Sequence, residues 1–502
     1  MVRPMRRKTA TILIVPFVLA SLLISYLGIQ SATSLLILAD SHILRTAPNQ
    51  GTLILHVNNV GSVDFYLAGI GLPSLMLNLY NGTHFVAGAT YFKYELEGDI
   101  AYTSPFLLGP SLALKAGRNG TVILRGSFDK TVQYQNFVHI TVYTNLGKTF
   151  SSRVPCLGLL RADMEKLKTY GPQVLQVLER LDAYLDTRLT SDGWLVTHPS
   201  WPEELREEAM AIAQITAGYL ALYNVTGNEK YLNKALFGGN WLVKAQQLDG
   251  GWGLPWAWDH FDGHSHPANF TYTITTLLAI QSLVDLYRAT GEKQFLDAAL
   301  KGVKNVLDVK GYVILDEREG RGTLVYCSYE PKTSLGRAIE IYNIDGAGIT
   351  TFLKVYEVTK NETLVKIARG LANNLIRAQY EDGVWAYAPY TQSRPPGYAQ
   401  MVESGLLDFY RFTGDEKVFW AVLKGLVWLI NEGSTDPNFC LIISETLGMN
   451  LTDRVIDVIK GWSAGQKPDG SFSGGTATRS DGGMLFSLAT LLERMGYREK
   501  EE

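Results

Sequence analysis

Cysteine and surplus charge are both scarce in this sequence. Its 502 residues include three cysteines (Cys156, Cys327 and Cys440) and no C-x-x-C pair. This excludes a disulfide scaffold, a zinc ribbon and a dithiol redox centre, and the odd count leaves at least one thiol unpaired within the chain. Charged residues make up 19% of the chain and the formal net charge is -3, so no basic footprint indicates nucleic acid as a partner. With 46% hydrophobic residues, the chain is long enough to bury more than one core.

The beginning of the chain lacks charge over a long stretch. Its first eight residues include four Arg or Lys, and no charged residue then occurs from Thr9 to Ala39. The apolar run Ala10–Ile29 has about 20 residues, the length that spans a bilayer core, and a basic flank stays cytoplasmic. We therefore expect residues 1–32 to be a cytoplasmic stub with a transmembrane signal anchor. This predicts a single-pass protein of the cell membrane with the bulk of the chain extracytoplasmic; a cleaved signal peptide is the alternative. Six N-x-T sequons fit an extracytoplasmic glycoprotein: Asn81, Asn119, Asn224, Asn269, Asn361 and Asn450.

Tryptophan is absent from the next segment, residues 33–158, which has many short β-branched or alternating runs. Examples are 51–60 (GTLILHVNNV) and 137–146 (FVHITVYTNL), and Gly, Asn and Pro separate such runs. This pattern predicts a small all-β sandwich of about seven strands. No acidic or histidine cluster stands out in it, so we expect it to be a spacer or docking domain.

From about residue 160 to 502 the periodicity is helical, and a tight-turn motif L-Y-x-x-T or Y-x-x-T repeats. Its four copies begin at Tyr223, Tyr287, Tyr356 and Tyr410. The glycine that follows three of the threonines is a left-handed helix cap, and Asn228 or Asp415 can then cap the next helix. The motif therefore predicts helical hairpins with short connections at one end.

A second repeat closes the outer helix of a hairpin, in the pattern Q-x-x-D-G-x-W/F. It spans Gln246–Trp252, Gln379–Trp385 and Gln466–Phe472. About twelve helices then predict a mainly α protein whose residues 160–502 form an (α/α)6 toroid of helical hairpins. Terpene cyclases share this turn, but the sequence has no D-x-D-D acid motif. The long loops all emerge at one end of the toroid, which is where function is usually found.

These long loops carry six of the ten tryptophans and all four histidines of the helical region. Aromatic rings stack on the apolar face of a sugar, so we expect a wall that binds substrate. Its predicted residues are Trp256, Trp258, Asp259, His260, His264 and His266. The alternating Asp and His could instead bind a divalent cation. We favour the substrate wall, and we expect no cofactor.

Tyrosine, glutamate and arginine gather on the same predicted face. Candidates are Tyr329, Glu330 and Tyr387 for catalysis, with Tyr342, Asp345, Arg394, Tyr398, Glu403 and Arg479 for substrate binding. Arginine can neutralise a substrate carboxylate while Tyr or Glu moves a carbon-bound proton. Paired carboxylates would equally suit glycoside hydrolysis.

Two segments resemble the C-terminal domain of D-glucuronyl C5-epimerases. The run from Glu208 through Tyr219 to Leu232 is similar to the start of that family's helical domain. The string Tyr329-Glu330-Pro331, followed by Asp345-Gly346, looks like its Tyr-Glu loop and the helix after it, although the family's usual Asn is Asp here. The resemblance implies an αα barrel and inversion of C5 of a glucuronate within a polysaccharide. It also implies that Glu330 and Tyr329 form one acid/base group and Tyr387 the other.

Taken together, these features predict a membrane-anchored, extracytoplasmic carbohydrate-active enzyme whose partner is an acidic polysaccharide or glycan. C5 epimerisation of a uronate is the predicted reaction. A glycoside hydrolase or polysaccharide lyase on the same scaffold is one alternative. The other is a glycan-binding surface protein without catalytic activity.

Overall fold

The structure is a computed structural model that describes thirteen stretches of the chain. They are residues 33–47, 50–72, 75–79, 84–87, 90–104, 108–128, 136–158, 160–198, 200–259, 265–327, 340–432, 436–474 and 479–498. The chain forms two compact units. One comprises the described residues up to Leu160 together with Leu447–Met449, and the other comprises residues 161–446 and those from Asn450 onward.

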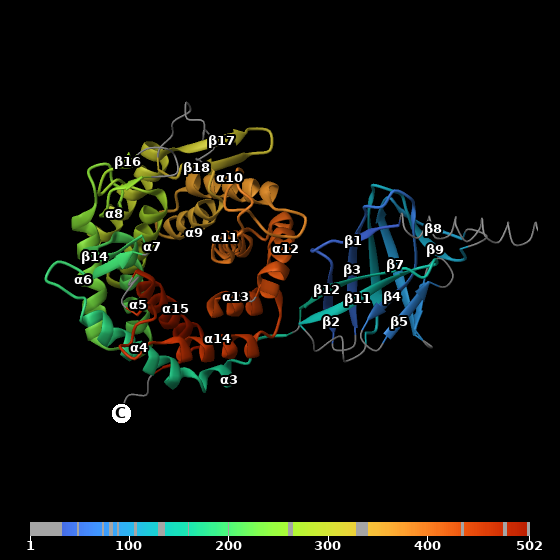
Figure 1. The fold of residues 1–502 in the computed structure, drawn as a ribbon, viewed down its shortest axis with the longest axis horizontal. Helices are drawn as coiled ribbons and strands as arrows, with labels where there is room; N and C mark the ends of the chain where they lie inside the picture. Colours follow the sequence, from blue (N-terminus) through green and yellow to red (C-terminus); the bar gives the residue numbers. More distant parts are fainter. Residues whose placement is uncertain are drawn as a thin grey trace, which may run out of the picture. The chain divides into compact units, whose positions relative to one another are not determined.

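The first unit is built from one sheet that closes on itself. Its strands are β1 (Leu35–Ile37), β2 (His42–Ala47), β3 (Gln50–Asn59), β4 (Phe65–Leu72), β5 (Leu75–Leu79), β6 (His84–Ala87), β7 (Thr90–Gly98), β8 (Ile100–Thr103), β9 (Ser111–Leu114), β10 (Asn119–Gly126), β11 (Phe137–Thr144) and β12 (Thr149–Leu157). β11 pairs with both β12 and β4, so the ring runs β11, β12, β2, β3, β10, β7, β6, β5, β4 (Figure 1). β12 and β2 pair in parallel, which makes the sheet mixed.

This closed, mixed sheet corrects the prediction of a β sandwich. Alternating burial, as along β3, gives each strand one inward face, and a sandwich and a closed ring both satisfy that pattern. Closure depends on the pairing of β11 with β4, where Thr141 lies opposite Gly71. A Cβ atom at Gly71 would lie 2.9 Å from the ring of Tyr143, so glycine permits this close approach. Periodicity along one strand carries no signal for a partner so far away in sequence.

The second unit is a ring of helical hairpins (Figure 1). Its helices are α3 (Met164–Lys168), α4 (Gly171–Asp186), α5 (Ala209–Thr226), α6 (Glu229–Ala245), α7 (Thr273–Thr290), α8 (Lys293–Lys304), the π-helix η1 (Asn305–Gly311), α9 (Tyr342–Thr359), α10 (Glu362–Ala378), α11 (Pro396–Thr413), α12 (Glu416–Glu432), α13 (Pro437–Leu447), α14 (Thr452–Gly465) and α15 (Arg479–Arg494). Short two-stranded ribbons lie between helices: β13 (Leu195–His198) with β14 (Trp201–Glu207), β15 (Trp258–Asp259) with β16 (Ser265–His266), and β17 (Tyr312–Asp316) with β18 (Arg321–Leu324). Helices α5, α7, α9, α11, α13 and α15 form the inner layer, and α4, α6, α8, α10, α12 and α14 surround them.

The tight turns between inner and outer helices form as the sequence predicts. Gly227 adopts a left-handed conformation with φ of 68°, and its N–H donates to the carbonyl of Tyr223. Asn228 then caps α6 by accepting a hydrogen bond from the N–H of Lys230 at 2.9 Å. Because each hairpin turns back at this end, the inner helices all point their N-termini towards the long loops.

The glutamine of the second repeat links neighbouring outer helices. Nε2 of Gln246 donates to the carbonyls of Gly250 and Ala298, each at 2.8 Å, and so joins the end of α6 to α8. Gln466 does the same at the end of α14, where it donates to Val177 of α4 at 2.9 Å. This last bond joins the final outer helix to the first and closes the ring.

Two further parts of the predicted fold class are wrong. The chain combines a strand-built unit with a helical unit, so it is a mixed protein and not a mainly α one. Within the described stretches, no helix has both the length and the apolar composition that crossing a membrane requires. This contradicts the predicted transmembrane helix and the single-pass location in the cell membrane. The run Ala10–Ile29, on which that prediction depended, lies outside the described residues.

Candidate active site

A cavity of about 520 Å³ lies at the N-terminal ends of the inner helices. Its lining residues are His198, Met210, Gln214, Leu254, Trp258, Tyr272, Ile274, Thr275, Leu278, Tyr326, Ile341, Asn343, Ile344, Tyr387, Tyr398, Met401 and Arg479. Four of these were predicted from sequence: Trp258, Tyr387, Tyr398 and Arg479. The volume suits a small ligand or one or two sugar rings.

Two inner helices, α5 and α7, present the same two positions to this cavity. In α5, Met210 and Gln214 stand thirteen and nine residues before the repeated Tyr223, and both line the cavity. In α7, Ile274 and Leu278 stand at the same distances before Tyr287. Positions four apart share one helical face, so counting back from the repeated tyrosine identifies the cavity side of a helix. This signal was present in the sequence, and the prediction did not use it.

Arg479, the first residue of α15, is the cationic side chain among the described lining residues. Its Nε lies 3.3 Å from Oε1 of Glu208, a completely buried carboxyl at the start of α5. Burial raises the pKa of Glu208, and the charge of Arg479 opposes that rise. The Arg479 side chain is 21% exposed, so it can hold the pair and still present N–H groups to a ligand. Glu208 was quoted only for the family resemblance and was not predicted as a site residue.

His198 lines the same cavity beside a stack of aromatic rings. Its ring lies 5.0 Å from that of Trp201 and 5.8 Å from that of Trp256. Nδ1 accepts a hydrogen bond from the N–H of Ser200 at 3.1 Å, so in the neutral ring the proton is on Nε2. Burial, with a smaller contribution from Arg479, lowers the pKa of His198 to about 4. His198 is therefore a neutral hydrogen-bond donor near neutral pH.

Tyrosines form another part of the lining. The rings of Tyr387 and Tyr398 lie 5.3 Å apart, and those of Tyr326 and Tyr272 lie 5.6 Å apart. Burial, followed by Tyr398, raises the pKa of Tyr387. Burial also raises the pKa of Tyr326, while Arg479 lowers it. Tyr387 and Tyr326 therefore carry their phenolic protons near neutral pH and can donate them.

The predicted substrate loop divides between cavity and core. Trp258 lines the cavity, but Trp256 is buried and stacks on Trp201 at 5.3 Å with an interplanar angle of 3°. His266 is also buried, and its Nδ1 is 2.8 Å from the hydroxyl of Tyr272. Asp259 is exposed and does not line the cavity. His260 and His264 lie outside the described residues.

Asp345 and Glu403 point away from the cavity, although both were predicted to bind substrate. They stand eleven and seven residues before their repeated tyrosines, roughly 200° around the helix from the cavity-lining positions. Asp345 accepts hydrogen bonds from the N–H of Leu324 at 2.9 Å and from Thr323, and it fixes β18 to α9. Glu403 is fully buried against Gly425 of α12, and neither of its oxygens has a hydrogen-bond partner among the described residues.

The remaining predicted residues lie in other places. Tyr342 is buried and absent from the described lining, and Arg394 pairs with Asp382 at 2.6 Å outside the cavity. Tyr329 and Glu330, the predicted catalytic pair, lie outside the described residues. In the described part of the chain, no group of three or more His, Cys, Asp or Glu could hold a metal ion.

No family model matches this chain, and no curated protein matches it in sequence. Solved structures do resemble it. A cellobiose 2-epimerase from Bacillus thermoamylovorans is 13% identical with a TM-score of 0.46, covering 65% of this chain and 99% of its own. A glycoside hydrolase family 76 mannosidase from Bacteroides thetaiotaomicron is 12% identical with a TM-score of 0.49, covering 64% and 100%. A sugar epimerase from a ruminal bacterium is 13% identical with a TM-score of 0.48, covering 64% and 98%. These comparisons do not show membership of the D-glucuronyl C5-epimerase family, and that resemblance stays a prediction.

Proposed function

We propose that this chain is a carbohydrate-active enzyme that inverts C5 of a uronate residue in an acidic glycan. One observation supports this most: the described lining of the cavity combines Arg479 with four tyrosines and contains no carboxylate side chain. An arginine and protonated phenols suit proton transfer beside a bound carboxylate.

The electrostatics of the cavity favour an anionic sugar. Arg479 contributes a positive charge, and the N-termini of α5, α7 and α9 add the positive ends of their helix dipoles. Trp258 offers an aromatic surface for the apolar face of the ring. We therefore assign Arg479 to the substrate carboxylate and Trp258 to the sugar ring.

Inversion requires two acid/base groups on opposite faces of the ring. One takes the C5 proton, and the electron pair moves into the carboxylate, which Arg479 stabilises in the enediolate form. Tyr387 then gives its phenolic proton to the other face of C5, and the raised pKa keeps that proton available. The family resemblance assigns the first group to Glu330 and Tyr329. The first group then holds the C5 proton and Tyr387 is a phenolate. Proton exchange with water returns both groups to their starting states, so the reaction consumes no oxidant or reductant.

Glycoside hydrolysis fits this lining less well, because it uses two carboxyl groups on either side of the scissile bond. A polysaccharide lyase is the second candidate, because it removes the same C5 proton before the C4 substituent leaves. Only the lyase shortens the chain and leaves an unsaturated uronate.

The test is incubation of the full chain in D2O with a panel of uronate-containing polysaccharides, followed by NMR of H5. Deuterium at C5 in an intact polysaccharide is the expected result. Shortened polysaccharide chains with an unsaturated end would show that the protein is a lyase. Shortened chains without an unsaturated end would show that it is a hydrolase. Polysaccharide binding without deuterium exchange or cleavage would show that the protein binds glycans and does not act on them.

A further inference from the structure

Three cavities follow one another inside the helical ring. The first is the candidate active site, of about 520 Å³. A narrow cavity of about 50 Å³ shares Gln214 and Leu278 with it. A third, the lower cavity, of about 430 Å³, shares Ala217, Asp285 and Lys354 with the narrow one. The narrow cavity therefore has walls in common with both of the others and lies between them.

The repeat of the helical hairpins explains this series. Five residues of α5 that line the three cavities in turn are Met210, Gln214, Ala217, Ala221 and Asn224. Five residues of α7 that do the same are Ile274, Leu278, Gln281, Asp285 and Arg288. The two sets occupy the same positions relative to the repeated tyrosines Tyr223 and Tyr287. Spacings of three and four residues put each set on one side of its helix, so α5 and α7 each turn one side to the cavities over nearly their whole length.

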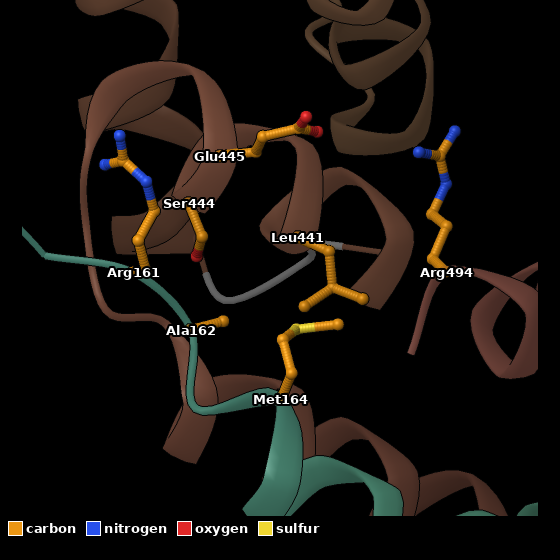
Figure 2. A pocket seen from close by; sticks show the side chains of 7 residues that line it. All are labelled: Arg161, Ala162, Met164, Leu441, Ser444, Glu445 and Arg494. Carbon is orange, nitrogen blue, oxygen red and sulfur yellow. The ribbon is translucent and has the colours of Figure 1, made fainter. Parts of the chain in front are cut away.

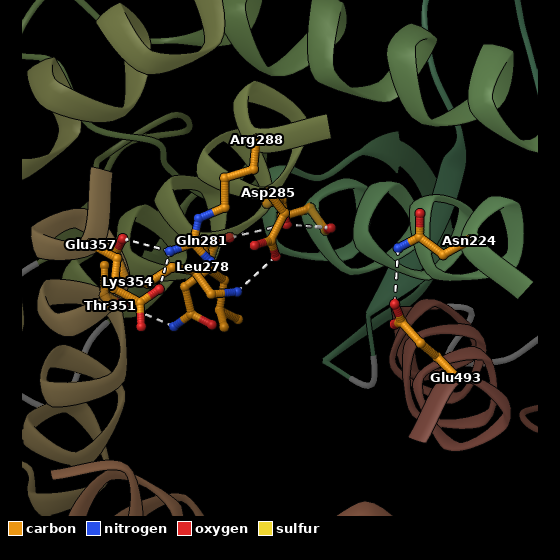
Figure 3. Close-up of polar contacts among 11 residues, drawn as sticks. Asn224, Leu278, Gln281, Asp285, Arg288, Thr351, Lys354, Glu357 and Glu493 are labelled. Atoms are coloured by element: carbon orange, nitrogen blue, oxygen red, sulfur yellow. Dashed lines mark hydrogen bonds and ion pairs between the residues drawn. The ribbon is translucent and has the colours of Figure 1, made fainter. Parts of the chain in front are cut away.

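This side of the helices is polar beyond the candidate active site. Beside the narrow cavity, Nε2 of Gln281 donates to Oγ1 of Thr351 at 2.8 Å, and Nζ of Lys354 donates to Oδ2 of Asp285 at 2.7 Å. Figure 3 shows both contacts between α7 and α9. The side chains of Lys354 and Asp285 are 26% and 25% exposed, so water reaches a region where an apolar core would exclude it.

The narrow cavity has the size and polarity to hold water. One water molecule needs about 10–15 Å³ of such a volume, together with two to four polar partners. The cavity of about 50 Å³ is therefore large enough for more than one water molecule, although it is too small for a sugar ring. Gln214, Gln281, Asp285 and Lys354 supply donors and acceptors along its wall.

The lower cavity opens to solvent at the C-terminal ends of the inner helices. Asn224, Arg288 and Ala289 line it, and all three are exposed. Arg494 also lines it, and on its other side contributes to a separate pocket of about 410 Å³, where Figure 2 shows it far from Arg161. Among the described lining residues, that pocket shares none with the narrow cavity or with the candidate active site. The series of cavities thus ends at the lower cavity.

We propose that these three cavities form one hydrated passage, through which the candidate active site exchanges protons with solvent at the far end of the ring. This role rests on the proposed function. After inversion the first acid/base group holds the C5 proton, Tyr387 is a phenolate, and a bound polysaccharide covers the mouth of the cavity. The first group gives its proton to a water molecule in the passage, and Tyr387 takes one from a water molecule there. One O–H bond breaks and one forms at the water chain, so the protons balance and nothing is oxidised or reduced.

Hydration of the narrow cavity can be tested without substrate. Among the described lining residues of the three cavities, Gln281 belongs to the narrow one alone. NMR of the full chain should show cross-relaxation between water and the side-chain amide of Gln281, which the spectrum of Gln281→Leu identifies. Gln466 is the control, because its buried amide donates to Val177 and Gly470. Absence of water contact at Gln281 would overturn the passage, whatever reaction the protein catalyses.

A reversible plug tests the proton route. Methyl methanethiosulfonate converts the thiol of Ala217→Cys to a methyl disulfide that fills the junction of the narrow and lower cavities, and dithiothreitol removes it. The three native cysteines are buried and should not react. Ala289→Cys is the matched control, because Ala289 is exposed and, among the described lining residues, belongs to the lower cavity alone. Failure of Ala217→Cys to react would show that the lower cavity does not reach this point, and would overturn the passage.

The measurement is made at low conversion in D2O with a uronate polysaccharide. Deuterium at C5 of recovered substrate reports proton exchange while substrate is bound, and it is divided by the amount of inverted product. The plug in Ala217→Cys should lower this ratio at least about tenfold, and dithiothreitol should restore it. The ratio should not change in Ala289→Cys. An unchanged ratio in plugged Ala217→Cys would overturn the proton route. Water contact at Gln281 without exchange or inversion in wild type would keep the hydrated passage and count against the proposed function.

Discussion

Arg479 forms an ion pair with Glu208 at the candidate active site, with 3.3 Å between Nε and Oε1. The two residues come from opposite ends of the sequence that forms the helical ring. α15 is the last inner helix and α5 the first. The ion pair thus forms only when the ring closes, and it fixes the one cation of the described lining beside a buried carboxyl.

The first prediction separates the two roles of Arg479. Arg479→Gln should lower the free energy of unfolding by about 3 kcal/mol, because Glu208 is left buried without a cation. Adding Glu208→Gln should recover most of that loss, since no charge remains buried. Neither variant should bind a uronate oligosaccharide. Urea unfolding and calorimetric titration measure both effects, and wild-type affinity in the double variant would limit Arg479 to a structural role.

The second prediction concerns ring closure by Gln466. Gln466→Leu removes the donor to Val177 and Gly470, leaving two carbonyls without it. We expect a loss of about 2–3 kcal/mol in the free energy of unfolding. Gln247→Leu is the matched control, because in the described part of the chain the side chain of Gln247 donates to the nearby carbonyl of Ala245 and to no neighbouring helix. Equal losses of unfolding free energy in the two variants would show that the bond from Gln466 to α4 adds no more stability than a local hydrogen bond.

The third prediction uses Asp345, whose pKa burial raises to about 8 against its hydrogen bonds from Leu324, Thr323 and Asn374. The folded state then holds a proton that the unfolded state releases above about pH 4. This contribution to stability is full at low pH and is lost as pH rises towards 8. Asp345→Asn removes the titration and keeps an acceptor for Leu324. Between pH 5 and 7 wild type should therefore lose about 2–3 kcal/mol relative to the variant.

Urea unfolding at both pH values measures this difference, and exposed Asp259→Asn controls for the loss of a carboxylate. A constant difference between wild type and Asp345→Asn over this range would show that Asp345 is ionised in the folded protein.

The fourth prediction concerns the charge of His198. Its pKa is lowered to about 4, chiefly by burial, so the folded state releases the proton that an unfolded chain holds below about pH 6.5. The imidazole should stay neutral throughout pH 5 to 8. The resonance missing from the NMR spectrum of His198→Gln identifies this ring. A midpoint near pH 6.5 for that resonance would show that His198 is exposed to solvent and cannot be a fixed neutral donor.

Local signals predicted the helical hairpins well. The turn after Y-x-x-T and the Asn or Asp cap that follows it depend on the conformation of a few neighbouring residues. Gly227 and Asn228 adopt the expected conformation and cap. The closed sheet was missed because the pairing of β11 with β4 is a long-range event. Alternation along a strand gives its inward face and not its partner.

The candidate site was predicted in part. Trp258, Tyr387, Tyr398 and Arg479 line the cavity, and their residue types and their position in or beside the long loops indicated them. Asp345 and Glu403 were chosen because they are acidic and close to the long loops. Their positions along the inner helices turn both side chains towards the outer helices. There Asp345 accepts a hydrogen bond from β18, and Glu403 is buried. Residue type gave the candidates, but only helical phase identifies the side of the helix on which each one lies.

The most direct test of the account is the rate at which deuterium enters C5 in Tyr387→Phe. The polysaccharide is the one that exchanges with wild type in D2O, and Tyr390→Phe is the control. Tyr390 belongs to the same loop and is 40% exposed, but it does not line the cavity. Loss of a proton-transfer group should slow exchange at least about 100-fold in Tyr387→Phe, and Tyr390→Phe should match wild type. Equal rates in wild type and Tyr387→Phe would contradict the assignment of Tyr387 and with it the proposed inversion at this cavity.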